Sequence, residues 1–395
     1  MTNSDQQKIE ELLTRGVEEV IVKEDLKKQL ESRKKIRLYL GIDPTGFDLH
    51  LGHVVPLWKL KEFCDLGHEV ILLIGDFTAK IGDPTGKDAT RVPLTDKQIA
   101  ANMADYKRQA SKILDFEKVK IVHNAKWLSK LKFEDILKLS GQFTVQQMII
   151  RDMFQRRLEK DLPINMQEFM YPLMQGYDSV AMDVDLEIGG NDQMFNMLIG
   201  RTLQKAYNNK DKNVMTTKLL LGLDGRKMSK TYDNFVGICE EPNNMFGKIM
   251  SMKDELIDQY FELATRLSKI EIDSIKNLST NPRDIKARLA FEIVKLYNGE
   301  VAAKKAEEEF NKVFTNKELP TNIEEFKTNK INYPILDLLC DTKLAPSKNE
   351  AKRLVEGGAV TIGENKISDW KQEIKLENDM VIKVGKRKFI KIKIL

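Results

Sequence analysis

Short apolar runs alternate with helical stretches over the first third of the chain, and this alternation constrains the fold most. Buried strands are predicted at residues 36–42, 70–75 and 119–123. Between them, residues 51–66 and 95–114 have the apolar spacing of helices, and Gly67 is placed to cap the first. Strand and helix in this order predict a parallel sheet with right-handed crossovers. The fold class is therefore α/β, with a Rossmann-like parallel sheet.

The flanking segments extend this first domain, which we place at residues 1–241. Residues 5–35 have helical spacing without a clear stop. Residues 124–180 are mostly helical and read as an insertion. The chain then returns to a strand at residues 185–188, which ends at Gly189 and Gly190.

A change of character near residue 242 predicts two further domains. Residues 242–320 are helical and charged, without strand patterns. Residues 316–332 are polar and indicate a linker. Residues 333–395 form a small α+β domain, with a helix at 347–356 and strands at 360–362, 381–384 and 389–394.

Composition excludes several classes of protein. The chain has 395 residues and a formal net charge of +4, so any nucleic-acid signal must be local. Cys64, Cys239 and Cys340 are widely spaced, which indicates neither a disulfide framework nor a zinc site and favours a reducing compartment. The N-terminus has no targeting signal, and no stretch approaches the ~18 apolar residues of a membrane span. We expect a cytoplasmic protein without membrane contact or a tightly bound metal.

The first motif, PTGFDLHLGH at residues 44–53, directly follows the first predicted strand. If a helix begins near Leu51, then His50 and His53 stand at its N-terminus, where free N–H groups and the helix dipole favour phosphate. Gly52 lets a nucleotide base approach the backbone closely. Two histidines beside a tight turn can also serve packing alone. The motif lies beyond the carboxyl end of a parallel strand, and this position favours ligand binding over packing alone.

The second motif, KMSKT at residues 227–231, follows an apolar run at 219–223 that we predict to be a strand. Lys227 and Lys230 are mobile cations on a loop, which suits a clamp on a departing phosphate group. An ordinary solvated basic loop is the simpler alternative. The presence of the first motif upstream of this loop favours the clamp.

In this order and spacing, the two motifs resemble the signatures of class I aminoacyl-tRNA synthetases. Over essentially its whole length, the chain resembles the bacterial tyrosyl-tRNA synthetases. This resemblance implies a catalytic domain at 1–241, an anticodon-binding helical domain at 242–320 and an S-four-like RNA-binding domain at 333–395. It also implies that ATP activates L-tyrosine, with release of diphosphate, and that the tyrosine then passes to the 3' end of tRNA(Tyr).

The same resemblance implies roles for individual residues. Catalytic roles fall on Thr45, His50, His53, Lys87, Arg91, Lys227, Lys230 and Thr231. Tyrosine binding falls on Tyr39, Asp83, Tyr171, Gln175, Asp178 and Gln193, the last of which is shared with the ribose side. ATP or adenylate binding falls on Gly41, Asp43, Gly52, Gly190, Asp192 and Lys230.

Two positions depart from the pattern. Thr231 stands where the wider class more often has serine, and the hydroxyl is kept. Glu187 stands where some members have glutamine, and a carboxylate there can change the hydrogen bonding around the ligand.

A tyrosine pocket must satisfy one phenol hydroxyl and one ammonium. Tyr39 with Asp178 can hydrogen-bond the hydroxyl, and a site built for it rejects phenylalanine because its own polar groups would be left unpaired. Asp178 alone is more commonly a helix-surface carboxylate, and Asp83 before Pro84 can equally be a turn residue. The neighbouring Tyr171 and Gln175 make a purely solvated face the weaker reading for Asp178.

The expected chemistry needs no covalent nucleophile. The tyrosine carboxylate would attack the α-phosphate of ATP in line, and catalysis would rest on positioning and charge stabilisation. Mg²⁺ is expected to accompany ATP, since this ion usually binds through substrate phosphates and not in a cage of protein ligands.

The C-terminal segment carries the local basic signal. Its last fifteen residues hold six Lys or Arg and no acid, and the alternation at the end indicates a strand with one basic face. With the helix at 347–356, the segment resembles the S-four-type RNA-binding module. The tRNA-binding residues implied are Lys348, Lys352, Arg353, Lys386, Arg387 and Lys388. An edge strand protected by lysines is the alternative.

We also predict a homodimer, because the insertion carries many large apolar groups that a partner can cover. These are Trp127, Phe143, Val145, Met148, Ile149, Ile150, Met153 and Phe154. Packing of these groups onto the chain's own sheet is the alternative.

Two other functions stay open at this point. A tryptophanyl-tRNA synthetase shares the fold and both motif types, and Tyr39 with Asp178 argues against it. A non-catalytic RNA-binding protein with a decayed synthetase domain is the second, and the intact motifs argue against that.

Overall fold

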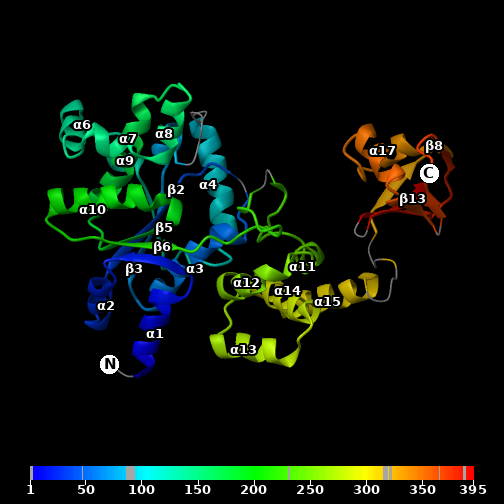
Figure 1. The fold of residues 1–395 in the computed structure, drawn as a ribbon, viewed down its shortest axis with the longest axis horizontal. Coiled ribbons are helices and arrows are strands. Elements are labelled where there is room, and N and C mark those ends of the chain that lie inside the picture. The colour runs from blue at the N-terminus through cyan, green and yellow to red at the C-terminus, as the bar shows by residue number, and fades with distance from the viewer. Residues whose placement is uncertain are drawn as a thin grey trace. The chain divides into compact units, whose positions relative to one another are not determined.

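The computed structural model describes residues 3–46, 48–85, 94–229, 232–314, 319, 323–363, 365–385 and 388–395. The chain divides into two compact units, residues 1–303 and 304–395, each of which is described by itself (Figure 1). Six of the predicted site residues lie outside the described residues, namely Lys87, Arg91, Lys230, Thr231, Lys386 and Arg387.

A six-stranded sheet forms the centre of the first unit, in the order β1-β6-β5-β2-β3-β4. Its strands are β1 (Val17–Ile21), β2 (Arg37–Ile42), β3 (Glu69–Ile74), β4 (Lys120–His123), β5 (Leu186–Gly190) and β6 (Asn213–Thr217). From β6 to β4 all neighbours are parallel, which confirms the predicted sheet. Only β1, among these strands, runs antiparallel to its neighbour, so the sheet is mixed.

The helices of this part cover the sheet and build the insertion (Figure 1). They are α1 (Asn3–Thr14), α2 (Lys23–Glu31), α3 (Leu51–Asp65), α4 (Asp96–Ala110), α5 (Ala125–Leu128), α6 (Phe133–Ser140), α7 (Val145–Ile149), α8 (Asp152–Glu159), α9 (Met166–Met182) and α10 (Met194–Asn208). Between β4 and β5 the chain is helical, from α5 to α9.

Local sequence explains where the helix after β2 begins and ends. His50 has extended backbone (φ −118°) and precedes the first helical residue, Leu51. The helix ends at Asp65, and Gly67 follows with φ +87°, a conformation that glycine adopts without strain. Most of α3 is buried because it packs under β2 and β3, whose residues are themselves largely buried.

Two predictions about strands were wrong. Residues 5–35 were predicted to be helical throughout, yet β1 interrupts them between α1 and α2 and pairs with β6. The strand before the second motif is β6, at 213–217. The apolar run at 219–223 forms irregular backbone with an isolated bridge between Leu221 and Lys227.

Among the described residues from 242 to 314 the structure is helical, as predicted for this part of the chain. The helices are α11 (Pro242–Met250), α12 (Ile257–Ala264), α13 (Lys269–Leu278), α14 (Pro282–Asn298) and α15 (Glu300–Phe314). Across the described residues, no helix has both the length and the apolar character needed to cross a membrane.

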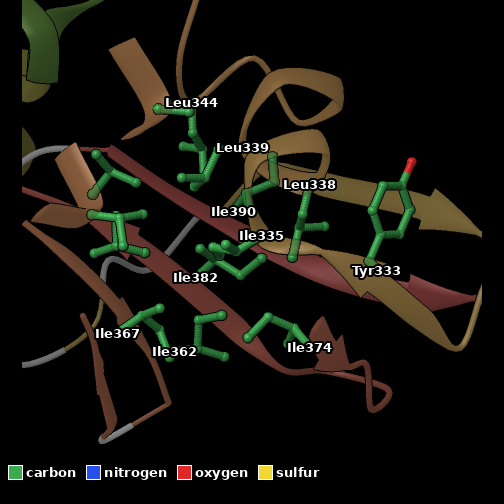
Figure 2. Packing of buried hydrophobic residues seen from close by; sticks show 14 of the residues in the cluster. Tyr333, Ile335, Leu338, Leu339, Leu344, Ile362, Ile367, Ile374, Ile382 and Ile390 are labelled. Carbon is green, nitrogen blue, oxygen red and sulfur yellow. The ribbon is translucent and has the colours of Figure 1, made fainter. Parts of the chain in front are cut away.

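The second unit contains a five-stranded sheet in the order β10-β9-β12-β13-β7 and a two-stranded sheet of β11 and β8. Its elements are β7 (Glu325–Thr328), β8 (Asn332–Pro334), α16 (Ile335–Asp341), α17 (Lys348–Glu356), β9 (Val360–Ile362), β10 (Asn365–Ile367), β11 (Glu373–Lys375), β12 (Val381–Val384) and β13 (Lys388–Ile394). Figure 2 shows its core, where Leu338 and Leu339 of α16 pack over Ile382 and Ile390 of the sheet.

This unit corrects two further predictions. Residues 325–328, predicted to be part of a linker, form β7, which pairs in parallel with β13. The final strand β13 lies between β12 and β7, so the reading of a lysine-protected edge strand is wrong. Its Lys391 and Lys393 both pair with Asp379, at 2.8 and 3.3 Å, which partly neutralises the predicted basic face.

Candidate active site

The carboxyl ends of β2 and β5 lie side by side where the order of the parallel strands reverses. From β2 the chain builds outward to β3 and β4, and then returns to β5 on the other side of β2. Open α/β sheets bind ligands at such a point. A cavity of about 190 Å³ lies there. Its lining includes the predicted residues Tyr39, Gly41, Asp43, Asp83, Tyr171, Gln175, Asp178 and Gln193.

The carboxylate of Asp178, on α9, belongs to a residue of the cavity lining. This side chain is 2% exposed. Trp127 Nε1 donates to its Oδ1 at 2.7 Å, and Asn124 Nδ2 donates to its Oδ2 at 3.2 Å. Burial raises the pKa of the Asp178 carboxyl well above its usual range, and the two N–H donors act against that shift. The helix-surface reading of Asp178 is therefore wrong.

A polar network surrounds Asp83 on the loop after β3. Thr85 donates to Asp83 Oδ1 from its backbone nitrogen at 2.9 Å and from its hydroxyl at 2.6 Å. Gln193 Nε2 donates to Asp83 Oδ2 at 2.8 Å. Asn196 Nδ2 in turn donates to Gln193 Oε1 at 3.1 Å and to Gln175 Oε1 at 2.9 Å. Asp83 does stabilise a turn, because it accepts two hydrogen bonds from Thr85. Asp83 also lines the cavity, so the turn is not its only role.

Asp43, directly after β2, receives two hydroxyl donors from other elements. Tyr171 donates to its Oδ2 at 2.8 Å, and Thr78 donates to its Oδ1 at 2.8 Å. Burial, together with the charge of Asp43, raises the pKa of Tyr171 well above its usual range. A Cβ at Gly75 would lie 2.1 Å from Asp43 Oδ1 and 2.3 Å from Thr78 Oγ1, so only glycine fits there.

The two motifs meet in space. Leu51 N donates to Val236 O at 2.9 Å, which ties the start of α3 to the segment after the second motif. A Cβ on Gly52 would lie 3.5 Å from the sulfur of Met228. The sequence separates these motifs by more than 170 residues, so their contact is a product of the fold.

The histidines of the first motif and Lys227 of the second each have a close neighbour. The rings of His50 and His53 stack, with centroids 3.6 Å apart. His50 is buried, whereas His53 and Thr45 are exposed. Lys227 Nζ lies 3.5 Å from Asp192 Oδ2, which joins the second motif to the segment after β5 and Gly190.

Sequence reasoning missed several residues of the cavity. Thr78 and Asn124 line it, and Trp127 holds Asp178 although we predicted it to be an interface residue. Asn124 follows β4 directly, so its place after a parallel strand was a usable signal. Glu187 also lines the cavity, where its Oε1 accepts from Gln175 Nε2 at 3.2 Å.

The predicted tRNA-binding residues of α17 are exposed. The side chains of Lys348, Lys352 and Arg353 are 67%, 42% and 81% exposed, respectively. Lys352 Nζ also lies 4.3 Å from the ring centre of Trp370. Lys388 Nζ instead donates to Leu344 O at 3.1 Å within its own unit.

Comparison with known proteins assigns the chain to a family. The family described as tRNA synthetases class I (W and Y) matches residues 31–315. The tyrosine–tRNA ligase SYY-like C-terminal domain matches residues 313–392. The tyrosine–tRNA ligase of Carboxydothermus hydrogenoformans is 47% identical over 400 residues, which cover 97% of each chain. The chain belongs to the tyrosine–tRNA ligases. That of Thermotoga maritima is 44% identical, over 99% of this chain and 98% of its own.

Solved structures of this family share the fold. The tyrosyl-tRNA synthetase of Archaeoglobus fulgidus, solved in complex with L-tyrosine, aligns with a TM-score of 0.60 at 25% identity, over 76% of this chain and 99% of its own. A C-terminally truncated mitochondrial tyrosyl-tRNA synthetase of Aspergillus nidulans aligns with a TM-score of 0.66 at 24% identity, over 78% of this chain and 94% of its own. Because the chain belongs to the tyrosine–tRNA ligases, the alternative of a tryptophanyl-tRNA synthetase is wrong.

Proposed function

We propose that this cavity binds L-tyrosine and that the chain performs the two steps of a tyrosine–tRNA ligase. ATP activates tyrosine to tyrosyl-adenylate with release of diphosphate, and tyrosine then passes to the 3' end of tRNA(Tyr) with release of AMP. The observation that carries the proposal is that Asp178 and Tyr39 are both buried and both line the cavity. A buried carboxylate held by N–H donors is suited to accept one further hydrogen bond, such as that from a phenol.

Other residues of the cavity lining suit the substrate ammonium. Asp83 and Asp43 supply negative charge, and the amide oxygens of Gln175 and Gln193, which each accept from Asn196, have a second lone pair. Tyr171 fixes the orientation of Asp43. A tyrosine molecule held between Asp178 and Asp83 would direct its carboxylate toward the edge of the sheet that carries both motifs.

ATP would enter as its magnesium complex and bind along that edge. The N-terminus of α3, with His50 and Gly52, offers N–H groups and a positive dipole to phosphate. Lys227 adds a cation on the second motif. By resemblance, Lys87, Arg91, Lys230 and Thr231 complete the set that stabilises the charge moving to pyrophosphate. The step is a direct in-line displacement, which rests on positioning and electrostatics.

Amino-acid-dependent exchange of labelled pyrophosphate into ATP tests the proposal. We expect exchange with tyrosine and at most a trace with tryptophan or phenylalanine. Exchange with tryptophan alone would instead support a tryptophan enzyme. The absence of exchange with any amino acid, in a protein that melts cooperatively, would support the non-catalytic alternative.

We expect this enzyme to work in the cytoplasm.

The exposed apolar face of the insertion supports a homodimer. We define the insertion surface as Phe133, Ile136, Leu137, Val145, Ile150 and Met166, each more than a third exposed. The predicted interface was wrong for Met148, Met153 and Phe154, because these side chains are buried within the chain itself. We expect a second copy of the chain to cover this apolar surface, because large apolar patches exposed to solvent are rare on monomeric proteins.

We predict that Val145→Asp with Ile150→Asp converts a dimer into a monomer. Both side chains are 69% exposed, so the change adds charge to the insertion surface without disturbing the core. Sedimentation equilibrium at micromolar concentration measures the mass, with a monomer at 45.5 kDa. Leu278→Asp is the matched control, because Leu278 is 82% exposed on α13. A wild-type monomer would remove the case for the dimer.

A further inference from the structure

An arginine of the insertion reaches the loop that carries Asp83. Arg151 directly precedes α8, and its Nη2 donates to Thr85 Oγ1 at 2.8 Å. The same Thr85 hydroxyl donates to Asp83 Oδ1 at 2.6 Å. Arg151 and Thr85 are 66 positions apart in the chain, so this contact joins two separate segments of the first unit.

The direction of both hydrogen bonds is fixed by the groups at the two ends. A guanidinium has donors and no acceptor, whereas a carboxylate only accepts. Thr85 therefore accepts from Arg151 and gives its single hydroxyl proton to Asp83. The backbone nitrogen of Thr85 donates to the same carboxylate oxygen at 2.9 Å, and Gln193 donates to the other oxygen. Both oxygens of Asp83 are thus held by donors of known origin.

Two aromatic rings hold the guanidinium of Arg151. Its central carbon lies 4.6 Å from the ring centre of Phe195 on α10 and 5.9 Å from that of Phe154 on α8. A cation is attracted to the face of an aromatic ring, so these contacts restrict the side chain. Phe195 lies two residues after Gln193, the other side chain that donates to Asp83. Arg151 therefore links the loop after β3 to α8 and α10.

Stability of the fold alone explains this arginine poorly. Burial lowers the pKa of the Arg151 guanidinium, and the charge of Asp83 acts against that shift. Its Nη1 is buried and has no hydrogen-bond partner among the described residues. A buried donor without a partner destabilises a folded chain. These features favour a role for Arg151 in the neighbouring site.

We propose that Arg151 is a positioning residue that, through Thr85, holds the Asp83 carboxylate in the orientation that receives the ammonium of tyrosine. This inference rests on the proposed function of the cavity. The described lining of the cavity includes Asp83 but neither Thr85 nor Arg151, so Arg151 acts on the ligand through Asp83.

Charge alone predicts the opposite effect. A cation close to an ammonium site repels the ammonium, so its removal would strengthen amino-acid binding if only charge mattered. Positioning predicts weaker binding, because an Asp83 carboxylate released from Thr85 no longer has a fixed place. The sign of the change therefore separates the two explanations.

Two variants interrupt the connection at different points. Arg151→Met removes the guanidinium and keeps an unbranched side chain. Thr85→Val removes the hydroxyl and keeps both the branched shape and the backbone N–H that donates to Asp83. Asp83→Asn serves as the reference for loss of the carboxylate. Arg108→Met is the matched control, since Arg108 is 65% exposed on α4 and pairs with Asp105.

Three ligands isolate the ammonium. L-Tyrosine carries both charged groups, tyramine lacks the carboxylate, and 3-(4-hydroxyphenyl)propionate lacks the ammonium. Titration calorimetry on the full chain, without tRNA, gives the dissociation constant of each. We expect Arg151→Met and Thr85→Val each to weaken binding of tyrosine and tyramine by about 5–20-fold, the range for one lost hydrogen bond, and binding of the propionate by less than about twofold. The double variant should lose no more than the weaker-binding single variant, because both act on one carboxylate.

The outcomes separate this inference from the function on which it rests. If Asp83→Asn leaves tyramine binding unchanged, the ammonium binds elsewhere, and the assignment of Asp83 in the proposed function is wrong. If Asp83→Asn weakens tyramine binding while the Arg151 and Thr85 variants keep or strengthen it, only the positioning role is overturned. An equal loss for all three ligands also overturns it, because it shows a general structural defect. If Arg151→Met fails to fold, Thr85→Val decides alone.

Discussion

Removal of residues 315–395 will leave tyrosine-dependent pyrophosphate exchange nearly intact, while charging of tRNA(Tyr) falls by at least about 100-fold. The described residues that line the cavity lie in the first unit, whereas residues 304–395 form a compact unit with its own core. The cut falls after α15, because β7 belongs to the C-terminal sheet and should leave with it. Loss of phosphate contacts from a basic module weakens RNA binding of any sequence. Exchange and aminoacylation assays on the same preparation measure the two effects.

A variant of the full chain sharpens this test. Lys348→Gln, Lys352→Gln and Arg353→Gln together should weaken tRNA binding in part and reduce its dependence on salt, since each cation that contacts phosphate contributes to that slope. Lys118→Gln with Lys205→Gln in the first domain, where the two side chains are 71% and 52% exposed, serves as a control for general charge loss. Normal aminoacylation by the truncated chain would remove the case for an RNA-binding role.

Asp178→Asn should lower kcat/KM for tyrosine by about 100-fold or more, and with it the preference over phenylalanine. The change turns one acceptor into a donor where Trp127 and Asn124 already donate. The amide must therefore oppose one of these donors or the phenol of the substrate. Loss of a hydrogen bond to a charged group costs about 1.5–3 kcal/mol, and an unpaired buried group adds to this. Pyrophosphate exchange with both amino acids gives the two values.

The control for this variant is Glu159→Gln, an exposed carboxylate on α8. Thermal melting of the variants checks that the fold survives. Burial raises the pKa of the Asp178 carboxyl, so replacing it with a neutral amide removes the cost of desolvating a charge. An Asp178→Asn enzyme with wild-type selectivity would mean that the phenol binds elsewhere.

Patterns along the chain were enough to predict the parallel strands β2 to β5 and the helices α3 and α4. Each is an apolar run or a 3.6-residue periodicity bounded by its own turn residues, so local sequence carries the signal. The position of the first motif after β2 also pointed to His50, because the carboxyl ends of parallel strands share one edge. Tyr39, Asp178 and Gln193 came from the family resemblance, which no periodicity could supply.

Tertiary structure decided what depends on distant partners. β1 and β7 are short and only partly buried, and they form because β6 and β13 pair with them. In the insertion, packing buried Met148 and Phe154 and left Val145 exposed, although all three are apolar. Lys212 stands in the polar segment 208–213, NNKDKN, which carries no apolar residue to suggest burial. Its burial beside Glu187 depends on the space left by Gly200, and such a fit exists only once α9, α10, β5 and β6 are assembled.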